Sequence, residues 1–108
     1  MEISFESHQL RAVCRNVADA EALLGAEAAA SLRQVLADLR AADALFDLAG
    51  FIDLPAGEEN ELVLPVAPTH KIILRCGNRT PPRLPNGRVD WSAVDRLKVM
   101  EIAANGGH

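Results

Sequence analysis

The stretch from residue 26 to residue 48, AEAAASLRQVLADLRAADALFDL, decides the fold. Its larger apolar residues begin with Leu32, Val35, Leu36 and Leu39. They are separated by three, one and three residues, which is the spacing that places side chains on one face of an α-helix. The many alanines are strong helix formers and allow a close neighbour. The stretch therefore predicts a long amphipathic helix from Ala26 to about Leu48, with an apolar face that must pack against another element.

The residues before Gly25 predict a strand followed by a first helix. Residues 2–5, Glu-Ile-Ser-Phe, alternate polar and apolar side chains as a short strand does, and Ser7 can cap a following helix. One helical face then collects the apolar residues Leu10, Val13, Cys14 and Val17. Gly25 interrupts this pattern, so we expect two helices joined by a short turn, an antiparallel α-hairpin.

The residues after Gly50 predict strands. Leu62–Leu64 and Ile72–Leu74 are short runs typical of strands, and Leu97–Ile102 is the last one. Residues 77–87 contain three prolines and an Asn-Gly turn signal, which favours a surface loop. The expected fold class is α+β, with the N-terminal strand and the α-hairpin packed on one face of a small antiparallel sheet.

Composition limits the classes of function. A chain of 108 residues suits a single domain, residues 1–108, and its 49% hydrophobic and 24% charged residues are ordinary for a globular protein. The net charge of −4 argues against strong electrostatic binding of nucleic acid. Cys14 and Cys76 are far apart and lack metal-ligand spacing, and no apolar run could span a bilayer. We expect a cytoplasmic protein with free thiols, no metal and no membrane segment.

The C-terminal third carries a resemblance to a known family. Val89-Asp90-Trp91-Ser92, followed by Leu97-Lys98-Val99-Met100-Glu101-Ile102, is similar to the C-terminal signature of HigB-like "plasmid maintenance system killer" toxins of the RelE/ParE superfamily. Ile3-Ser4-Phe5, Leu39-Arg40-Ala41-Ala42 and Lys71-Ile72-Ile73-Leu74 resemble the family too. The resemblance implies a RelE-like fold and a bacterial type II toxin-antitoxin toxin. Such a toxin is a ribosome-dependent endoribonuclease, an mRNA interferase that inhibits translation without a cofactor and is silenced by a cognate antitoxin.

The resemblance also implies where the catalytic residues should lie. This branch uses a His and a Lys in the loop before the second strand, and the corresponding residues here are Ile52 and Pro55. The same loop carries Glu58 and Glu59, whose charges repel phosphate. The Tyr and His of the family's C-terminus correspond to Asn105 and Gly106, and the nearest later histidine is His108.

Three basic residues remain as catalytic candidates. The strand Arg of the family corresponds to Lys71, which keeps the charge but loses the planar guanidinium. Arg75 and His70 lie beside it in sequence. On a strand, Lys71 and Arg75 point the same way and His70 points oppositely. Residues of this kind are more often solvated strand or loop side chains than catalytic ones.

Several other residues admit two interpretations. Trp91 could stack on a base, but a lone tryptophan more often anchors a loop to the core. Arg79 and Arg83 of the predicted loop, and Lys98, are further cations of the same kind. The remaining arginines of the two expected helices fit solvated faces or an antitoxin-binding surface: Arg11, Arg15, Arg33 and Arg40.

The sequence leaves the activity open. One hypothesis is an active toxin that binds the ribosomal A site and cuts messenger RNA. The second is a catalytically degenerate RelE-like module that pairs with an antitoxin without nuclease activity, which explains the missing His and Lys. A third is inhibition of another target, as in gyrase-inhibiting ParE relatives, and no residue argues for it specifically.

Overall fold

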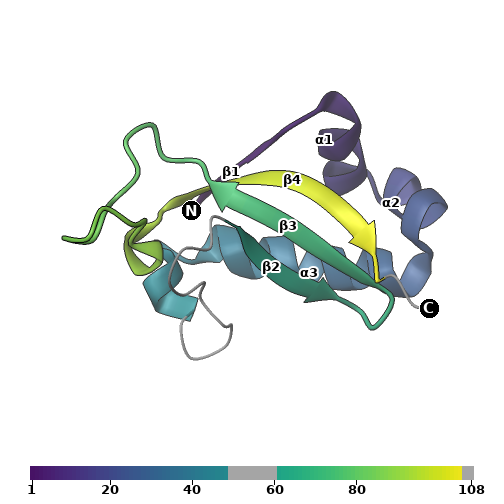
Figure 1. The fold of residues 1–108 in the computed structure, drawn as a ribbon. Helices are drawn as coiled ribbons and strands as arrows, with labels where there is room; N and C mark the ends of the chain where they lie inside the picture. The colour runs from purple at the N-terminus through teal and green to yellow at the C-terminus, as the bar shows by residue number, and fades with distance from the viewer. Residues whose placement is uncertain (49–60, 106–108) are drawn as a thin grey trace.

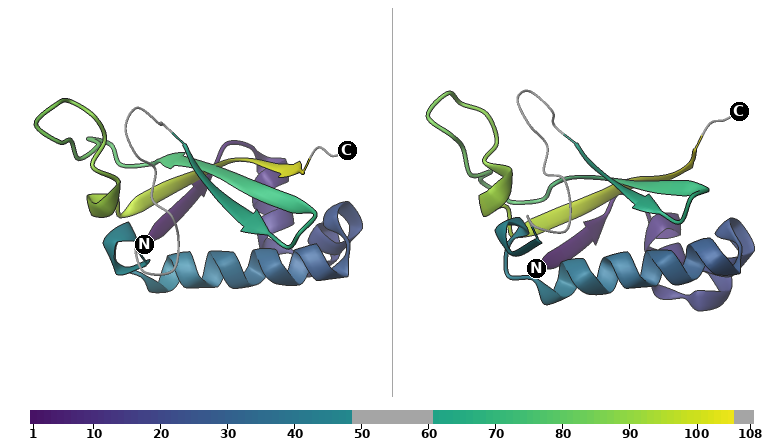
Figure 2. Two further views of the ribbon diagram at one scale, coloured as in Figure 1. Left: turned by 60° about the horizontal axis from the view of Figure 1, so that its bottom comes forward. Right: turned by 90° about the horizontal axis from the view of Figure 1, so that it is seen from below.

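The protein is built of a four-stranded sheet with three helices packed on one of its faces (Figures 1 and 2). This arrangement comes from a computed structural model, which describes residues 1–48 and 61–105. The expected α+β class is confirmed. No helix in the described ranges is long and apolar enough to cross a membrane.

The first predicted helix is two helices, separated at Asn16. Helix α1 (His8–Arg15) begins after Ser7, whose Oγ accepts a hydrogen bond from the Leu10 amide at 3.2 Å, as the sequence predicted. Asn16 is extended (φ −115°, ψ 118°), and its Oδ1 accepts from the Ala18 and Asp19 amides to begin helix α2 (Val17–Leu24). Because an asparagine side chain competes for backbone amides, it ends one helix and caps the next.

The long helix α3 (Ala26–Ala41) ends about seven residues before the position that the sequence predicted. Ala42 is extended, and the Asp47 carboxylate accepts from the backbone amides of Asp43 and Ala44 at 3.0 and 3.3 Å. These hydrogen bonds begin a separate 3₁₀ helix, η1 (Leu45–Leu48). The side chain of Leu45 in this helix is fully buried in the core. The predicted break at Gly25 is confirmed, because its φ of 87° lies in the left-handed region that favours glycine.

The sheet is mixed, so the expectation of an antiparallel sheet was wrong. Strands β1 (Glu2–Phe5), β2 (Leu62–Val66), β3 (His70–Cys76) and β4 (Arg96–Ala104) lie in the order β1-β4-β3-β2. β2, β3 and β4 are antiparallel neighbours, but β1 pairs with β4 in parallel. The helices return the chain to the end where β1 started. β2 and β4 therefore both run in the direction of β1.

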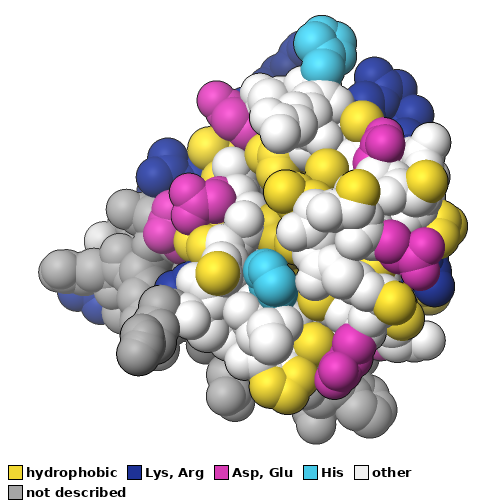
Figure 3. Space-filling model, turned by 90° about the vertical axis from the view of Figure 1, so that its right-hand side faces the viewer, with side chains coloured by type: hydrophobic (Ala, Val, Ile, Leu, Met, Phe, Trp, Pro, Cys, Tyr) yellow, Lys and Arg dark blue, Asp and Glu magenta, His cyan; other side chains and the backbone are white. Residues whose placement is uncertain are grey.

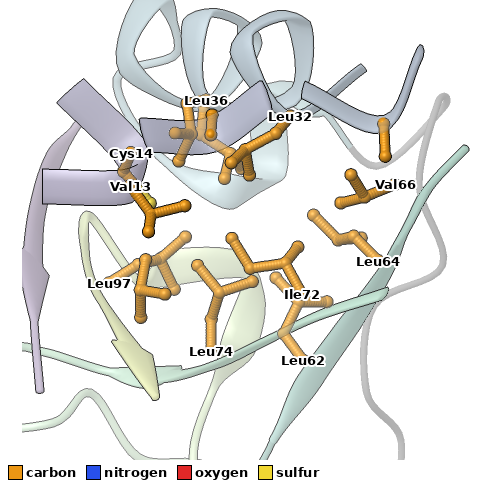
Figure 4. Packing of buried hydrophobic residues seen from close by; sticks show 14 of the residues in the cluster. Val13, Cys14, Leu32, Leu36, Leu62, Leu64, Val66, Ile72, Leu74 and Leu97 are labelled. Atoms are coloured by element: carbon orange, nitrogen blue, oxygen red, sulfur yellow. The ribbon is translucent and has the colours of Figure 1, made fainter. Parts of the chain in front are cut away.

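The core fills the space between the sheet and the helices (Figure 4). Leu97, Leu74 and Ile72 point from the sheet toward Leu32 and Leu36 of α3. The side chains of α1 that join them are Val13 and Cys14. Trp91, in the 3₁₀ helix η2 (Trp91–Ala93), is only 5% exposed, which confirms that it anchors the loop before β4 to the core.

Replacing Leu36 with alanine tests this packing. Leu36 is 1% exposed, so Leu36→Ala should lower the free energy of unfolding by about 2–5 kcal/mol in urea denaturation. Leu23→Ala is the matched control, because Leu23 is 54% exposed and its loss should change stability by about 0.5 kcal/mol or less. Equal effects of the two substitutions would contradict this arrangement of the core.

Candidate functional site

The candidate site is the face of the sheet opposite the helices, which we call the open face. Along β3, Ile72 and Leu74 are fully buried toward the helices, and Lys71 and Arg75 therefore point to the open face. His70 points toward the helix side, at the end of the strand. The sequence prediction that Lys71 and Arg75 share a face without His70 is confirmed.

A row of four charged side chains, two cations flanked by two carboxylates, crosses one end of the open face. Arg75 of β3 lies directly opposite Lys98 of β4. Two cations in this position repel each other, but each is paired with a carboxylate. The Arg75 guanidinium lies 3.3 Å from Glu61, and the Lys98 ammonium lies 2.7 Å from Glu6. We call Glu61, Arg75, Lys98 and Glu6 the charge ladder.

The charge ladder is exposed to solvent, so water and salt screen its ion pairs and they contribute little to stability. Its effect on ionisation is still visible at Glu6. The hydrogen bond from Lys98 holds the pKa of the Glu6 carboxyl below its ordinary value, with the charge of Lys98 and, more weakly, that of Arg75 acting in the same direction. A similar pair joins Arg96 to Glu2 at 3.4 Å. Each of these three cations at this end of the open face, Arg75, Lys98 and Arg96, is therefore paired with a carboxylate.

Lys71 differs from these cations. Its cross-strand neighbours are Pro65 on β2 and Ala103 on β4, neither of which carries a polar side chain. Within residues 1–48 and 61–105, it is the one cation of the open face without an ion pair. Lys71 therefore has no charged residue directly opposite it, and Glu101 of β4 occupies a diagonal position on the same face.

Distance limits how these residues could cooperate. Four residues along a strand span about 13 Å, so Lys71 and Arg75 begin far apart and could meet one phosphate only through their long side chains. His70 is hydrogen-bonded at Nδ1 to the Thr69 hydroxyl at 2.8 Å. The three predicted catalytic residues are neighbours in sequence, but the structure brings only two of them to one face.

The other predicted positions are accounted for as follows. Arg83 stabilises its own loop, because its guanidinium donates to the Gly87 carbonyl at 2.8 Å. Asn105 donates to the Pro68 carbonyl at 2.8 Å and so joins the end of β4 to the β2–β3 turn. The remaining positions lie outside the described residues: Ile52, Pro55, Glu58, Glu59, Gly106 and His108.

The sequence analysis missed the carboxylates of the charge ladder. Glu6 and Glu61 lie just outside β1 and β2, so no strand pattern includes them. Their partners depend on the register of Arg75 against Lys98. A search for acidic residues flanking each predicted strand would have found them, but the register that pairs them is set by the tertiary fold.

Among the described residues, neither a metal-ligand cluster nor the hollow beside α3 includes the predicted catalytic residues. In the part of the chain that the structure describes, no three His, Cys, Asp or Glu side chains are grouped to hold a metal ion. A hollow of about 780 Å³ lies elsewhere, between α3, η1 and β2, and is lined by Asp38, Asp43 and Asp47 together with apolar side chains. None of the three predicted catalytic residues lines it.

Comparisons with known proteins add no relative. No family model matches the chain, and neither a curated protein nor a solved structure matches it. The likeness to RelE/HigB toxins therefore rests on the residues quoted above.

Removing Lys98 tests the charge ladder. Because the pKa of Glu6 is lowered from 4.5, the Glu6–Lys98 attraction is fully present above that pH and is lost as the pH falls through the lowered pKa. Lys98→Gln should return the pKa of Glu6 toward its ordinary value in a carboxyl NMR titration. Lys71→Gln, on the same face, should leave it unchanged. A low Glu6 pKa in Lys98→Gln would refute the pairing.

Proposed function

We propose that the protein is a RelE/HigB-like toxin of a type II toxin-antitoxin system, which binds the ribosome and messenger RNA through the open face. The observation that carries the proposal is Lys71, a cation without an ion-pair partner in the described part of the chain. It stands at the position that the family resemblance assigns to a phosphate-binding cation. The α+β arrangement, with the helices on one face and an exposed sheet on the other, supports the same conclusion.

In this proposal Lys71 binds the phosphate at the cut site. Cleavage by the neighbouring 2′-hydroxyl places additional negative charge on the phosphate oxygens, and a nearby ammonium group stabilises that charge. Arg75 would engage a second phosphate after leaving Glu61. His70 takes no part, because it points to the other face.

A second function has an observation in its favour. Apart from Lys71, the cations of the open face are paired with carboxylates, at Arg75, Lys98 and Arg96. No histidine among the described residues joins Lys71 on that face to move a proton. This arrangement fits a catalytically degenerate module that pairs with an antitoxin and does not cut RNA.

A cleavage assay distinguishes the two functions. Purified protein is added to ribosomes carrying a defined messenger RNA, and the 5′ ends of the products are mapped. The proposal predicts cuts in phase with the codons, reduced about 100-fold or more in Lys71→Ala. Arg15→Ala is the control, because it removes a cation from the helix side and should leave the cuts unchanged. Absence of cuts with the unsubstituted protein would reject the nuclease and favour the binding module.

A further inference from the structure

A hairpin between β3 and η2 projects from one end of the sheet (Figures 1 and 2). Residues 77–90 form it, and an isolated bridge joins Arg83 to Val89 across it. In both views of Figure 2, α3 lies below the sheet and the hairpin rises above it. The hairpin therefore stands on the side of the open face, and we call it the arginine hairpin.

The arginine hairpin is basic, although the chain as a whole has a net charge of −4. It carries Arg79, Arg83 and Arg88, and all three are exposed. Its single carboxylate, Asp90, lies at the base and accepts a hydrogen bond from the Ser92 hydroxyl at 2.7 Å. Because neighbouring charges of one sign act together on a charged partner, the arginine hairpin is a local region of positive potential.

The contacts of two of these arginines leave their charge in place. Arg79 makes no side-chain hydrogen bond or ion pair within residues 1–48 and 61–105. Arg83 donates from one nitrogen to the Gly87 carbonyl, which is a neutral acceptor. No described carboxylate neutralises either guanidinium, so both can bind an anion of another molecule.

Backbone hydrogen bonds fix the shape of the arginine hairpin before a partner binds. The Leu84 amide donates to the Arg88 carbonyl at 2.8 Å, and the Gly87 amide donates to the Leu84 carbonyl at 2.9 Å. Three residues of the hairpin are prolines, which restrict the backbone, and buried Trp91 anchors its base. Arginines on such an ordered support lose less conformational freedom on binding than arginines on a disordered one.

The composition of the arginine hairpin favours a double-helical nucleic acid as its partner. No aromatic residue lies between residues 77 and 90, so the hairpin lacks the stacking surfaces on which unpaired bases are bound. Its one large exposed apolar side chain is Leu84, at 41%, which is too little apolar surface for a stable protein interface. Guanidinium groups suit phosphates, and a double helix presents closely spaced phosphates to several arginines at once.

We propose that the arginine hairpin binds the phosphate backbone of a double-helical segment of RNA without reading its bases. The choice of RNA rests on the proposed function, because a protein that acts on the ribosome meets folded ribosomal RNA. The hairpin includes neither Lys71 nor any residue of the charge ladder. It therefore holds the protein on structured RNA, and the open face receives the messenger RNA.

Fluorescence anisotropy with the complete chain and a labelled RNA stem-loop tests the proposal. We expect binding that weakens linearly with salt on logarithmic scales, because bound phosphates release counterions. Arg79→Gln should weaken binding about tenfold and reduce the salt slope by about 1, since one phosphate contact is lost. Arg33→Gln, on α3, is the matched control and should bind as the unsubstituted protein does.

Several outcomes would overturn the proposal. One is the absence of binding to the stem-loop at low salt, and another is equal affinity of Arg79→Gln and the unsubstituted protein. Tighter binding to an unpaired RNA of the same composition would show that single strands are the target. Tighter binding to a DNA duplex of the same sequence would move the target to DNA.

Cosedimentation with ribosomes separates this proposal from the nuclease. Lys71→Ala should sediment with ribosomes as the unsubstituted protein does, and Arg79→Gln should be partly released as salt is raised. Binding through Arg79 without cuts in the messenger RNA would reject the nuclease and leave the arginine hairpin supported. Undiminished cuts and ribosome binding in Arg79→Gln would reject the role of the arginine hairpin and leave the nuclease supported.

Discussion

The parallel pairing of β1 with β4 is the constraint on which the rest of the structure depends. It places the N-terminal strand beside the last strand of the chain and fixes β4 between β1 and β3. The same pairing brings Met1 to the end of α3, where its amino nitrogen donates to the carbonyls of Leu39, Arg40 and Ala42. The strand and the long helix therefore hold each other in position.

That pairing also separates the two faces of the sheet. With the helices on one face, every second residue of β3 enters the core, and the residues between them form the open face. An extra residue, Met100, interrupts the register of β4 against β3 between Ile73 and Leu74 and allows β4 to present Lys98 opposite Arg75. The charge ladder is a consequence of this register. The binding properties proposed for the open face depend on backbone geometry as much as on residue type.

The sequence predicted the elements better than their ends and partners. The spacing of Leu32, Leu36 and Leu39 was sufficient to predict the long helix. Gly25 was sufficient to predict where that helix begins, because both signals are local properties of the sequence. The division at Asn16 was missed, since the apolar spacing continues through it and only the side-chain cap reveals the break. The mixed sheet was not predicted because the parallel pairing of β1 with β4 joins the two ends of the chain. That pairing depends on the tertiary fold and not on a local pattern.

The candidate site shows the same limit. Alternation along β3 correctly placed Lys71 and Arg75 on one face, because it follows from strand geometry alone. Glu61 and Glu6 could not be paired with Arg75 and Lys98 without the register of three strands. The end of the molecule at which α1 and α2 lie carries hydrophobic side chains interspersed with basic and acidic ones (Figure 3). Exposed Val17 and Leu23 belong to α2, and no sequence pattern distinguished them from core residues.

The measurement that tests the central claim most directly is the structure of the protein bound to a ribosome with messenger RNA in the A site. The account predicts that the RNA lies across the open face, with the Lys71 ammonium about 3 Å from a phosphate oxygen. Messenger RNA lying against the helices, or a protein that binds the ribosome with its open face turned to solvent, would contradict it.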